Sequence, residues 1–148
     1  MDTQHVVMHH NVKPNRALGQ NFLTDKDTQK RIALSAIFGS LPVLEIGAGL
    51  GFLTEELLAL GAEVTAVEID SRLCDILKKR LPSVRIIHAD FLNIDMHNLL
   101  YSKHFCAVGN LPYYATTAIA EKLLCAMPEQ VVIMVQKVAA VRFFALPG

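Results

Sequence analysis

The 148-residue sequence lacks several features that define membrane, secreted and disulfide-bonded proteins. No apolar run reaches the roughly 18 residues that a transmembrane helix needs. The first 13 residues contain no apolar segment typical of a signal peptide, and the cysteines are odd in number, without a Cys-x-x-Cys spacing. We therefore expect no membrane partner, a cytoplasmic location, and buried reduced thiols at Cys74, Cys106 and Cys125.

The chain also lacks an excess of charge of either sign, because 14 basic residues balance 14 acidic ones. A nucleic-acid-binding protein often carries a basic excess. The N-terminal region is locally basic, with Lys13, Arg16, Lys26, Lys30 and Arg31 against Asp25 and Asp27. This charge is compatible with RNA contact and equally with an ordinary solvated face.

The sequence shows no Ser-His-Asp arrangement typical of a hydrolase. His9-His10 has no partner Cys or His at metal-ligand spacing, so we expect no metal.

Hydrophobic residues make up 52% of the chain and charged residues 19%. Strands of a parallel sheet are buried on both faces and therefore consist of unbroken apolar runs. Such runs alternate with helical patterns, which predicts a doubly wound parallel α/β fold. We expect strands at 43–46, 63–69, 84–88, 105–108 and 131–135, the last followed by a short helical piece. We expect helices to be capped by Thr24 with Asp27, by Asp70 or Ser71, and by Thr116 or Thr117, with His88 in the core.

A glycine-rich turn at residues 47–51 (GAGLG) separates the first expected strand from a helix. Glycines there let the backbone turn sharply and approach a ligand closely. Dinucleotide enzymes use similar turns, but their pattern is GxGxxG, and no basic residue that would bind phosphate lies near this one. S-adenosylmethionine carries no phosphate, so the turn favours this cofactor over a nicotinamide dinucleotide. A nicotinamide-dependent oxidoreductase is the alternative enzyme.

Two acidic residues follow the next two expected strands, at the edge where open α/β sheets bind ligands. Glu68 ends the second strand and could accept both ribose hydroxyls of the cofactor, although it could also cap the next helix. Asp90 follows the third strand and could accept a hydrogen bond from the adenine amine, although a loop-turn role is the alternative. Glu45 could balance the positive charge of the cofactor or have a structural role.

The tetrapeptide Asn110-Leu111-Pro112-Tyr113 follows the fourth expected strand. An exocyclic adenine amine is a poor nucleophile, because its lone pair is delocalised into the ring. The side-chain oxygen of Asn110 and the carbonyl of Leu111 could accept its two hydrogens and direct the nitrogen toward a methyl donor. Pro112 would stiffen the turn, and Tyr113 would stack on the base. A plain Asn-Leu-Pro turn with a buried tyrosine is the structural alternative.

Taken together, these motifs resemble the ribosomal RNA adenine dimethyltransferase family, bacterial KsgA type. The resemblance spans about residues 11–148 and rests on Leu18-Gly19-Gln20-Asn21-Phe22-Leu23, Glu45–Gly51, Val67–Asp70, Asp90-Phe91 and Asn110–Tyr114. It implies a Rossmann-like class I S-adenosylmethionine-dependent methyltransferase fold. It also implies dimethylation of the exocyclic amines of two adjacent adenosines in small-subunit (16S) ribosomal RNA, with the pre-ribosomal small subunit as partner and a monomeric protein.

The resemblance also assigns roles to matching positions. Asn21 and Leu23 would contact the cofactor where the N-terminal segment closes over it, and Gly47 would lie against its methionine part. The remaining assignments are Glu68 to the ribose, Asp90 to the adenine, Asn110 to the methyl group and target amine, and Phe22 and Tyr113 to the base pocket. The related erythromycin-resistance enzymes act on large-subunit RNA and more often carry Ser-Gln-Asn-Phe and Asn-Ile-Pro-Tyr. Residues 18–22 and Leu111 therefore favour the small-subunit type.

The family pattern continues beyond Gly148 with two further strands and a helical RNA-binding domain. We therefore expect an N-terminal arm at 1–23 with a cofactor-covering segment, and an incomplete catalytic domain at 24–148 that is truncated after the fifth strand. That strand would be an exposed edge with uncovered apolar surface. The sequence departs from the family pattern in one further respect. After Gln136-Lys137 the family usually has acidic residues interleaved among apolar ones, whereas Val138 and Val141 stand in that stretch here and residues 142–146 are more apolar than expected. A non-catalytic RNA-binding remnant is the remaining alternative.

Overall fold

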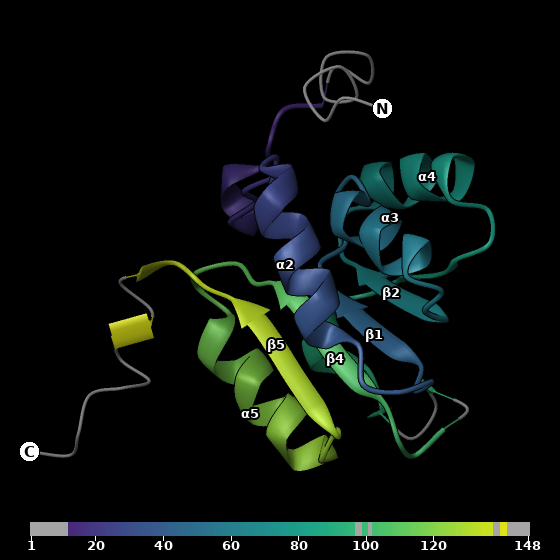
Figure 1. Ribbon diagram of the computed structural model, residues 1–148. Coiled ribbons are helices and arrows are strands. Elements are labelled where there is room, and N and C mark those ends of the chain that lie inside the picture. Colours follow the sequence, from purple (N-terminus) through teal and green to yellow (C-terminus); the bar gives the residue numbers. More distant parts are fainter. Residues whose placement is uncertain (1–11, 97–98, 101, 138–139, 142–148) are drawn as a thin grey trace, which may run out of the picture.

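A computed structural model describes residues 12–96, 99–100, 102–137 and 140–141 (Figure 1). Residues 1–11 of the expected N-terminal arm, with His9-His10, lie outside these residues, and so does part of the expected helical piece after the fifth strand. The elements in chain order are η1 (Arg16–Leu18), α2 (Lys26–Ala36), β1 (Val43–Ile46), α3 (Phe52–Ala59), β2 (Val64–Glu68), α4 (Ser71–Arg80), β3 (Arg85–His88), η2 (Phe91–Asn93), β4 (Cys106–Asn110), α5 (Thr116–Ala126) and β5 (Gln130–Met134). The five expected strands are all present: the first has the expected ends, and the ends of the others differ by at most two residues.

The five strands form one parallel sheet in the order β3-β2-β1-β4-β5. The chain moves outward from β1 to β3 and then returns to the other side of β1 with β4. The direction of winding therefore reverses between β1 and β4, and ligands of open α/β sheets bind at this point, beyond the carboxyl ends of the strands. Val43 pairs with Cys106 and Ile46 with Gly109, so both strands end at the same height.

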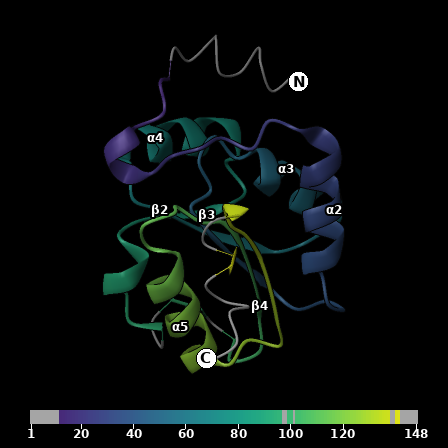
Figure 2. The same cartoon turned by 90° about the vertical axis from the view of Figure 1, so that its left-hand side faces the viewer.

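Helices cover the two faces of the sheet unequally (Figure 2). Helices α2, α3 and α4 pack on one face, where Ala33, Leu57 and Leu77 are fully buried. Helix α5 packs on the other face together with η2, through residues that include Leu123 and Phe91. The result is a three-layer α/β arrangement with a core on each side of the sheet, as the alternating pattern predicts.

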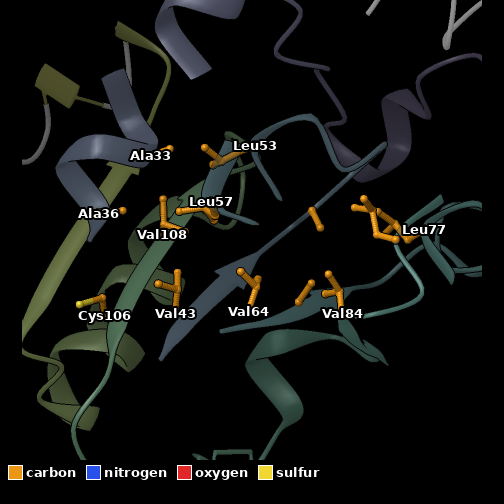
Figure 3. Packing of buried hydrophobic residues seen from close by; sticks show 13 residues of the cluster. Ala33, Ala36, Val43, Leu53, Leu57, Val64, Leu77, Val84, Cys106 and Val108 are labelled. Carbon is orange, nitrogen blue, oxygen red and sulfur yellow. The ribbon is translucent and has the colours of Figure 1, made fainter. Parts of the chain in front are cut away.

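The larger core forms a row of side chains across neighbouring strands (Figure 3). Val43 of β1 pairs with Cys106 of β4 on one side and with Val64 of β2 on the other. These three side chains point toward the same helices. Every residue of β1 and β2 is buried, as expected for central parallel strands. The outer strands differ: residues of β3 are half-buried or exposed and those of β5 half-buried. Within the described part of the chain β5 pairs only with β4, as expected of an edge strand.

Three local expectations were wrong. Helix α2 is capped by Asp25, whose carboxylate accepts from the Thr28 amide, rather than by Thr24. Helix α5 has no side-chain cap, because the Thr116 hydroxyl donates to the Pro112 carbonyl instead. His88 is exposed rather than in the core, because β3 is an edge strand, and its Nε2 lies 3.1 Å from the Ile69 carbonyl oxygen.

The expectation of buried thiols holds for Cys74 and Cys106, whereas Cys125 is exposed on α5. Burial raises the pKa of the Cys74 thiol to about 11, so this group stays protonated at neutral pH. The expected Asp70 cap of α4 is confirmed, with the carboxylate accepting from the Arg72 amide. None of the described helices has the length and apolar character that crossing a bilayer requires.

The pairing of β1 with β4 depends on the absence of a side chain at Gly109. A Cβ there would lie 2.6 Å from the Ile46 carbonyl oxygen. We predict that Gly109→Ala lowers the free energy of unfolding by about 1–3 kcal/mol, because β1 and β4 would have to separate at their carboxyl ends. Urea unfolding followed by circular dichroism measures this. A value within about 0.5 kcal/mol of the wild type would show that the sheet adapts without cost.

Candidate active site

Two cavities open at the point where the winding reverses. The first, called here the glycine-turn cavity, lies between the turn after β1, the ends of β2 and β4, and the N-terminal segment at residues 18–23. Its walls are formed by Leu18, Gly19, Gln20, Asn21, Phe22, Leu23, Glu45, Gly47, Ala48, Gly49, Leu50, Phe52, Leu53, Glu68, Ile69, Leu73, Asn110 and Pro112. It therefore brings together residues that are up to 94 positions apart in the chain (112 minus 18).

The second, called here the Asp90 cavity, lies beside the first and toward η2 and α5. Its walls are formed by Ile46, Gly47, Val67, Ile69, Ala89, Asp90, Phe91, Leu92, Pro112, Tyr114, Ala115 and Ile119. Gly47, Ile69 and Pro112 belong to both walls, so the two cavities are adjacent. No lysine or arginine of the described residues lines either one.

The glycine turn approaches the end of β4 closely. Gly47 has φ 72°, which disfavours residues with a side chain. A Cβ at Gly47 would have only the Asn110 carbonyl oxygen, 3.8 Å away, within 4 Å, so this position faces open space in the cavity. Gly51 has φ 83° and a different constraint, because a Cβ there would lie 2.7 Å from Leu77 on α4. The turn therefore exposes backbone to a ligand on one side and packs against α4 on the other.

Glu68 lies at the end of β2 and is only 4% exposed. Its Oε2 accepts from the Gly49 amide at 2.8 Å, and its Oε1 accepts from the Asp70 amide at 3.0 Å. Burial raises the pKa of this carboxyl, and the hydrogen bonds from Asp70 and Gly49 oppose that rise. Each oxygen keeps a second lone pair, so the group fixes the glycine turn and can still accept from a ligand in the cavity.

Glu45 is a second buried carboxyl in the wall of the glycine-turn cavity, with 1% exposure. Its only hydrogen bond among the described residues comes from the Thr54 hydroxyl, at 2.6 Å. Burial raises the pKa of Glu45 to about 8, a rise that Thr54 opposes and the nearby Glu68 reinforces. In the free protein this group is therefore mostly protonated at neutral pH, and a cationic ligand in the cavity would favour its ionised form.

Asp90 caps the 3-10 turn η2 and also lines the second cavity. Its Oδ1 accepts from the Leu92 amide at 2.9 Å, and its Oδ2 accepts from the Asn93 side chain at 3.1 Å. The loop-turn role considered above is therefore present, and it holds the carboxylate at the cavity wall. The two roles are compatible, because an ionised carboxylate accepts more than two hydrogen bonds.

Asn110 ends β4 with its amide nitrogen donating to the Asn21 carbonyl at 2.8 Å. This bond assigns the amide orientation and leaves Oδ1 without a hydrogen bond among the described residues. The Leu111 carbonyl also has no such partner, whereas the Leu111 amide donates to the Met134 carbonyl and its side chain is buried. Two oxygen acceptors in consecutive residues are thus available at the end of β4.

The rest of the tetrapeptide lies in the turn that precedes α5. The Pro112 carbonyl accepts from the Thr116 hydroxyl and the Ala115 amide, which closes the turn. Tyr113 is 46% exposed and is absent from both cavity walls, so its stacking role stays a prediction. Tyr114 lines the Asp90 cavity, and its ring lies 3.1 Å from the Cβ position of Gly19.

The N-terminal segment crosses from η1 to α2 on the side of the sheet that carries α3 and α4 (Figure 2). Its residues 18–23 form part of the wall of the glycine-turn cavity. The Gln20 amide nitrogen donates to Asp70 Oδ2 at 3.0 Å, and the buried Gln29 donates to the Leu23 carbonyl at 2.7 Å. Phe22 lies over the glycine turn, with ring atoms 3.5 and 3.6 Å from the Cβ position of Gly49. With the bond between Asn110 and Asn21, these contacts tie the segment to the N-cap of α4, to α2 and to β4.

Sequence reasoning missed the residues that hold this segment. Asp70 was expected only as a helix cap, but it also forms a bidentate pair with Arg72 and accepts from Gln20. Arg72 and Gln20 lower the pKa of Asp70 to about 2, so the group is ionised at neutral pH. Gln29 gave a usable signal, because a polar residue at a fully buried helix position needs a hydrogen-bond partner.

Comparison with known proteins places this geometry in a family. The family described as "Ribosomal RNA adenine dimethylase" matches residues 11–148. The ribosomal RNA small subunit methyltransferase A of Parabacteroides distasonis is 43% identical over 93% of this chain and 53% of its own length. That of Geobacillus thermodenitrificans is 40% identical over 99% of this chain and 54% of its own. The chain spans about half the length of the curated relatives it matches.

The chain belongs to the ribosomal RNA adenine dimethylase family. Solved structures agree with this assignment. The 23S rRNA methyltransferase ErmE superposes with TM-score 0.72 and 39% identity, over 82% of this chain and 50% of that one. A dimethyladenosine transferase from Plasmodium falciparum gives TM-score 0.71 and 30% identity, over 85% of this chain and 47% of that one. The expected class I methyltransferase fold is thereby confirmed.

The buried carboxyl of Glu45 predicts a pH-dependent stability for this chain. Its pKa is raised from 4.5 to about 8 by folding, so the folded state binds the extra proton between these values and stability falls as pH rises through them. We predict that Glu45→Gln removes this fall and raises the free energy of unfolding at pH 8 by about 1 kcal/mol or more. Urea unfolding from pH 5 to pH 8 measures it, and an equal slope in both proteins would contradict the burial effect.

The bond between Gln20 and Asp70 predicts how firmly the N-terminal segment is held. We predict that Gln20→Ala speeds amide hydrogen exchange at residues 18–23 by roughly tenfold, the equivalent of one hydrogen bond to a charged group. Exchange followed by mass spectrometry measures it, with the exposed Gln136→Ala as the control. Unchanged exchange in the Gln20 variant would mean that the bonds of Asn21 and Leu23 hold the segment without it.

Proposed function

We propose that the chain binds S-adenosylmethionine and carries the catalytic site for methylation of the exocyclic amine of adenine in ribosomal RNA. One observation carries the proposal: the loop after β4 has two consecutive oxygen acceptors without a hydrogen bond among the described residues, Asn110 Oδ1 and the Leu111 carbonyl. Asn110 lines the glycine-turn cavity, and Pro112, which follows Leu111, lines both cavities. A turn with only a structural purpose would have no need for two such acceptors beside a cavity.

The residues present fit this cofactor. The glycine-turn cavity contains two carboxyl groups, Glu45 and Glu68, and no basic side chain among its described walls, which suits a cation without phosphate. A nicotinamide dinucleotide would bring a pyrophosphate against these acids. The open space at Gly47 lets a ligand lie against backbone. We propose Glu68 for the ribose, Asp90 for the adenine, and Gly47, Asn21 and Leu23 for the methionine side of the cavity and its cover.

The bound cofactor would supply an electrophilic methyl group on its sulfonium. The chain supplies orientation: Asn110 Oδ1 and the Leu111 carbonyl accept the two hydrogens of the target amine and so direct its lone pair. Asn110 is better suited than an aspartate, since it accepts without a full charge and its amide nitrogen donates to Asn21. The nitrogen becomes cationic as it gains the methyl, and its proton then passes to water, so no strong general base is required.

Within ribosomal RNA, we propose two adjacent adenosines of the small-subunit (16S) RNA as the substrate, each dimethylated, with the pre-ribosomal small subunit as partner. The relatives named as small-subunit enzymes, at 43% and 40% identity, support this. A large-subunit target is the second candidate, supported by the 39% identity to ErmE. We further propose Phe22 and Tyr113 for contact with the base, a cytoplasmic location and a monomer.

Calorimetric titration tests cofactor binding first. We expect the chain to bind S-adenosylhomocysteine and to show no binding of NAD at the same concentration. Methyl transfer from labelled S-adenosylmethionine to unmodified small and large ribosomal subunits then tests the target, with a longer relative as the positive control. Preference for NAD, or binding of neither ligand, would contradict the proposal, and labelling of the large subunit would favour the second candidate.

Asn110 variants separate binding from transfer. We predict that Asn110→Ala lowers the rate of transfer by about 100-fold or more while cofactor affinity changes by less than about fivefold, because the lost acceptor acts on the amine. Asn110→Asp keeps an acceptor but cannot donate to Asn21, so it should also speed amide exchange at residues 18–23. Transfer within a few-fold of wild type in the alanine variant would contradict the orienting role.

A further inference from the structure

Lys122 on α5 uses its whole ammonium group to hold the turn at η2. Its Nζ donates to the carbonyls of Phe91 at 2.8 Å and Leu92 at 2.9 Å, and also to the carbonyl of Ile94. A lysine ammonium has three donors, so these bonds saturate it. The same nitrogen lies 5.2 Å from the centre of the Phe91 ring. Sequence analysis had given Lys122 no role.

This arrangement fixes a very short element at both ends. A 3-10 turn of three residues leaves most of its backbone groups without internal partners. Asp90 accepts from the Leu92 amide at one end, and Lys122 donates to the carbonyls at the other. Asp90, Phe91 and Leu92 all line the Asp90 cavity, so the turn that Lys122 holds is a wall of that cavity.

Helix α5 thereby connects the loop after β4 with the turn η2. Its first turn is closed by the Pro112 carbonyl, next to the acceptors of Asn110 and Leu111. Its second half carries Lys122, which reaches across to η2. The packing of Ile119 and Leu123 in the same core as Phe91 keeps the helix at a fixed distance from that turn.

We propose that Lys122 is a positioning residue for adenine recognition, which acts by holding the Asp90 carboxylate where it accepts a hydrogen bond from the exocyclic amine of the cofactor's adenosine. The inference rests on the proposed function, because it takes the ligand of the Asp90 cavity to be that adenosine. Without the ammonium, three carbonyls at the end of η2 would turn toward water, and the turn that carries Asp90 would lose its fixed geometry.

The test compares two thioether ligands by calorimetry on the 148-residue chain. S-adenosylhomocysteine carries the exocyclic amine, and S-inosylhomocysteine has a carbonyl oxygen in its place. We expect the wild type to prefer the adenosyl ligand, because a site built to accept from an amine rejects an analogue without it. Lys122→Met keeps the length of the side chain and removes its donors. It should weaken the adenosyl ligand about tenfold and the inosyl ligand less than about twofold.

Three further variants make the comparison specific. Lys79→Met makes the same change at an exposed position of α4 and should leave both affinities unchanged. Asp90→Ala should abolish the preference, and adding Lys122→Met to it should cause no further loss of preference, since both act on one hydrogen bond. Lys122→Arg keeps the charge but cannot bring three donors together on three carbonyls, so an intermediate preference is expected, and it serves as the test if the methionine variant does not fold.

Each outcome bears on a different statement. An unchanged preference in the Lys122 variants, or equal weakening of both ligands with a lower unfolding midpoint, would overturn the positioning role and leave only a structural one. A wild type that binds both ligands equally would overturn the adenine assignment of Asp90 and this inference with it, while cofactor binding would stand. A wild type that binds neither would overturn the proposed function as well.

Discussion

The close approach of β1 and β4 at their carboxyl ends is the constraint on which the site depends. Gly109 permits it, because no side chain separates this strand from the Ile46 carbonyl. The glycine turn after β1 and the Asn110 loop after β4 therefore begin side by side, with Gly47 next to the Asn110 carbonyl. The turn proposed to bind the cofactor and the loop proposed to orient the amine could not lie beside the same cavity if the two strands ended far apart along the sheet. The reversal of winding between β1 and β4 supplies the space above them.

Hydrogen bonds from the N-terminal segment at residues 18–23 also fix side chains of this site. It reaches the cavity from outside the sheet and bonds to one residue from each of three elements, Asp70, Gln29 and Asn110. The bond to Asn110 matters most, because it determines which end of that amide faces the cavity. A segment that covers the cofactor side therefore also orients the group proposed to hold the target amine. The hydrogen bond that holds Asn21 at the cavity is consequently the same bond that orients the Asn110 amide.

The fold was predictable from sequence because its signals are local and repeated. Unbroken apolar strands, a glycine turn and alternating helical patterns recur along the chain, and each is sufficient by itself to place one element. Properties that depend on the position of a residue in the tertiary structure could not be predicted from the sequence. His88 has the sequence context of a buried strand, but β3 is an edge. Thr24 and Asp25 are both good caps, and only the structure shows which one the helix uses. Glu68, Asp90 and Asn110 could be proposed because each follows a strand, whereas Gln20 and Lys122 act through contacts 50 and 31 residues away that no spacing reveals.

The protonated Glu45 has a consequence for ligand binding as a whole. With a pKa raised to about 8 in the free chain, this carboxyl carries a proton at neutral pH that it can release inside the cavity. A ligand with a positive charge near it would favour the ionised form, so that the proton would leave as the ligand enters. Affinity for such a ligand would then rise with pH. S-adenosylhomocysteine, the product left after methyl transfer, has no sulfonium charge and would favour the protonated form of Glu45. With the proposed cofactor, the buried acid would distinguish the methyl donor from its product by charge.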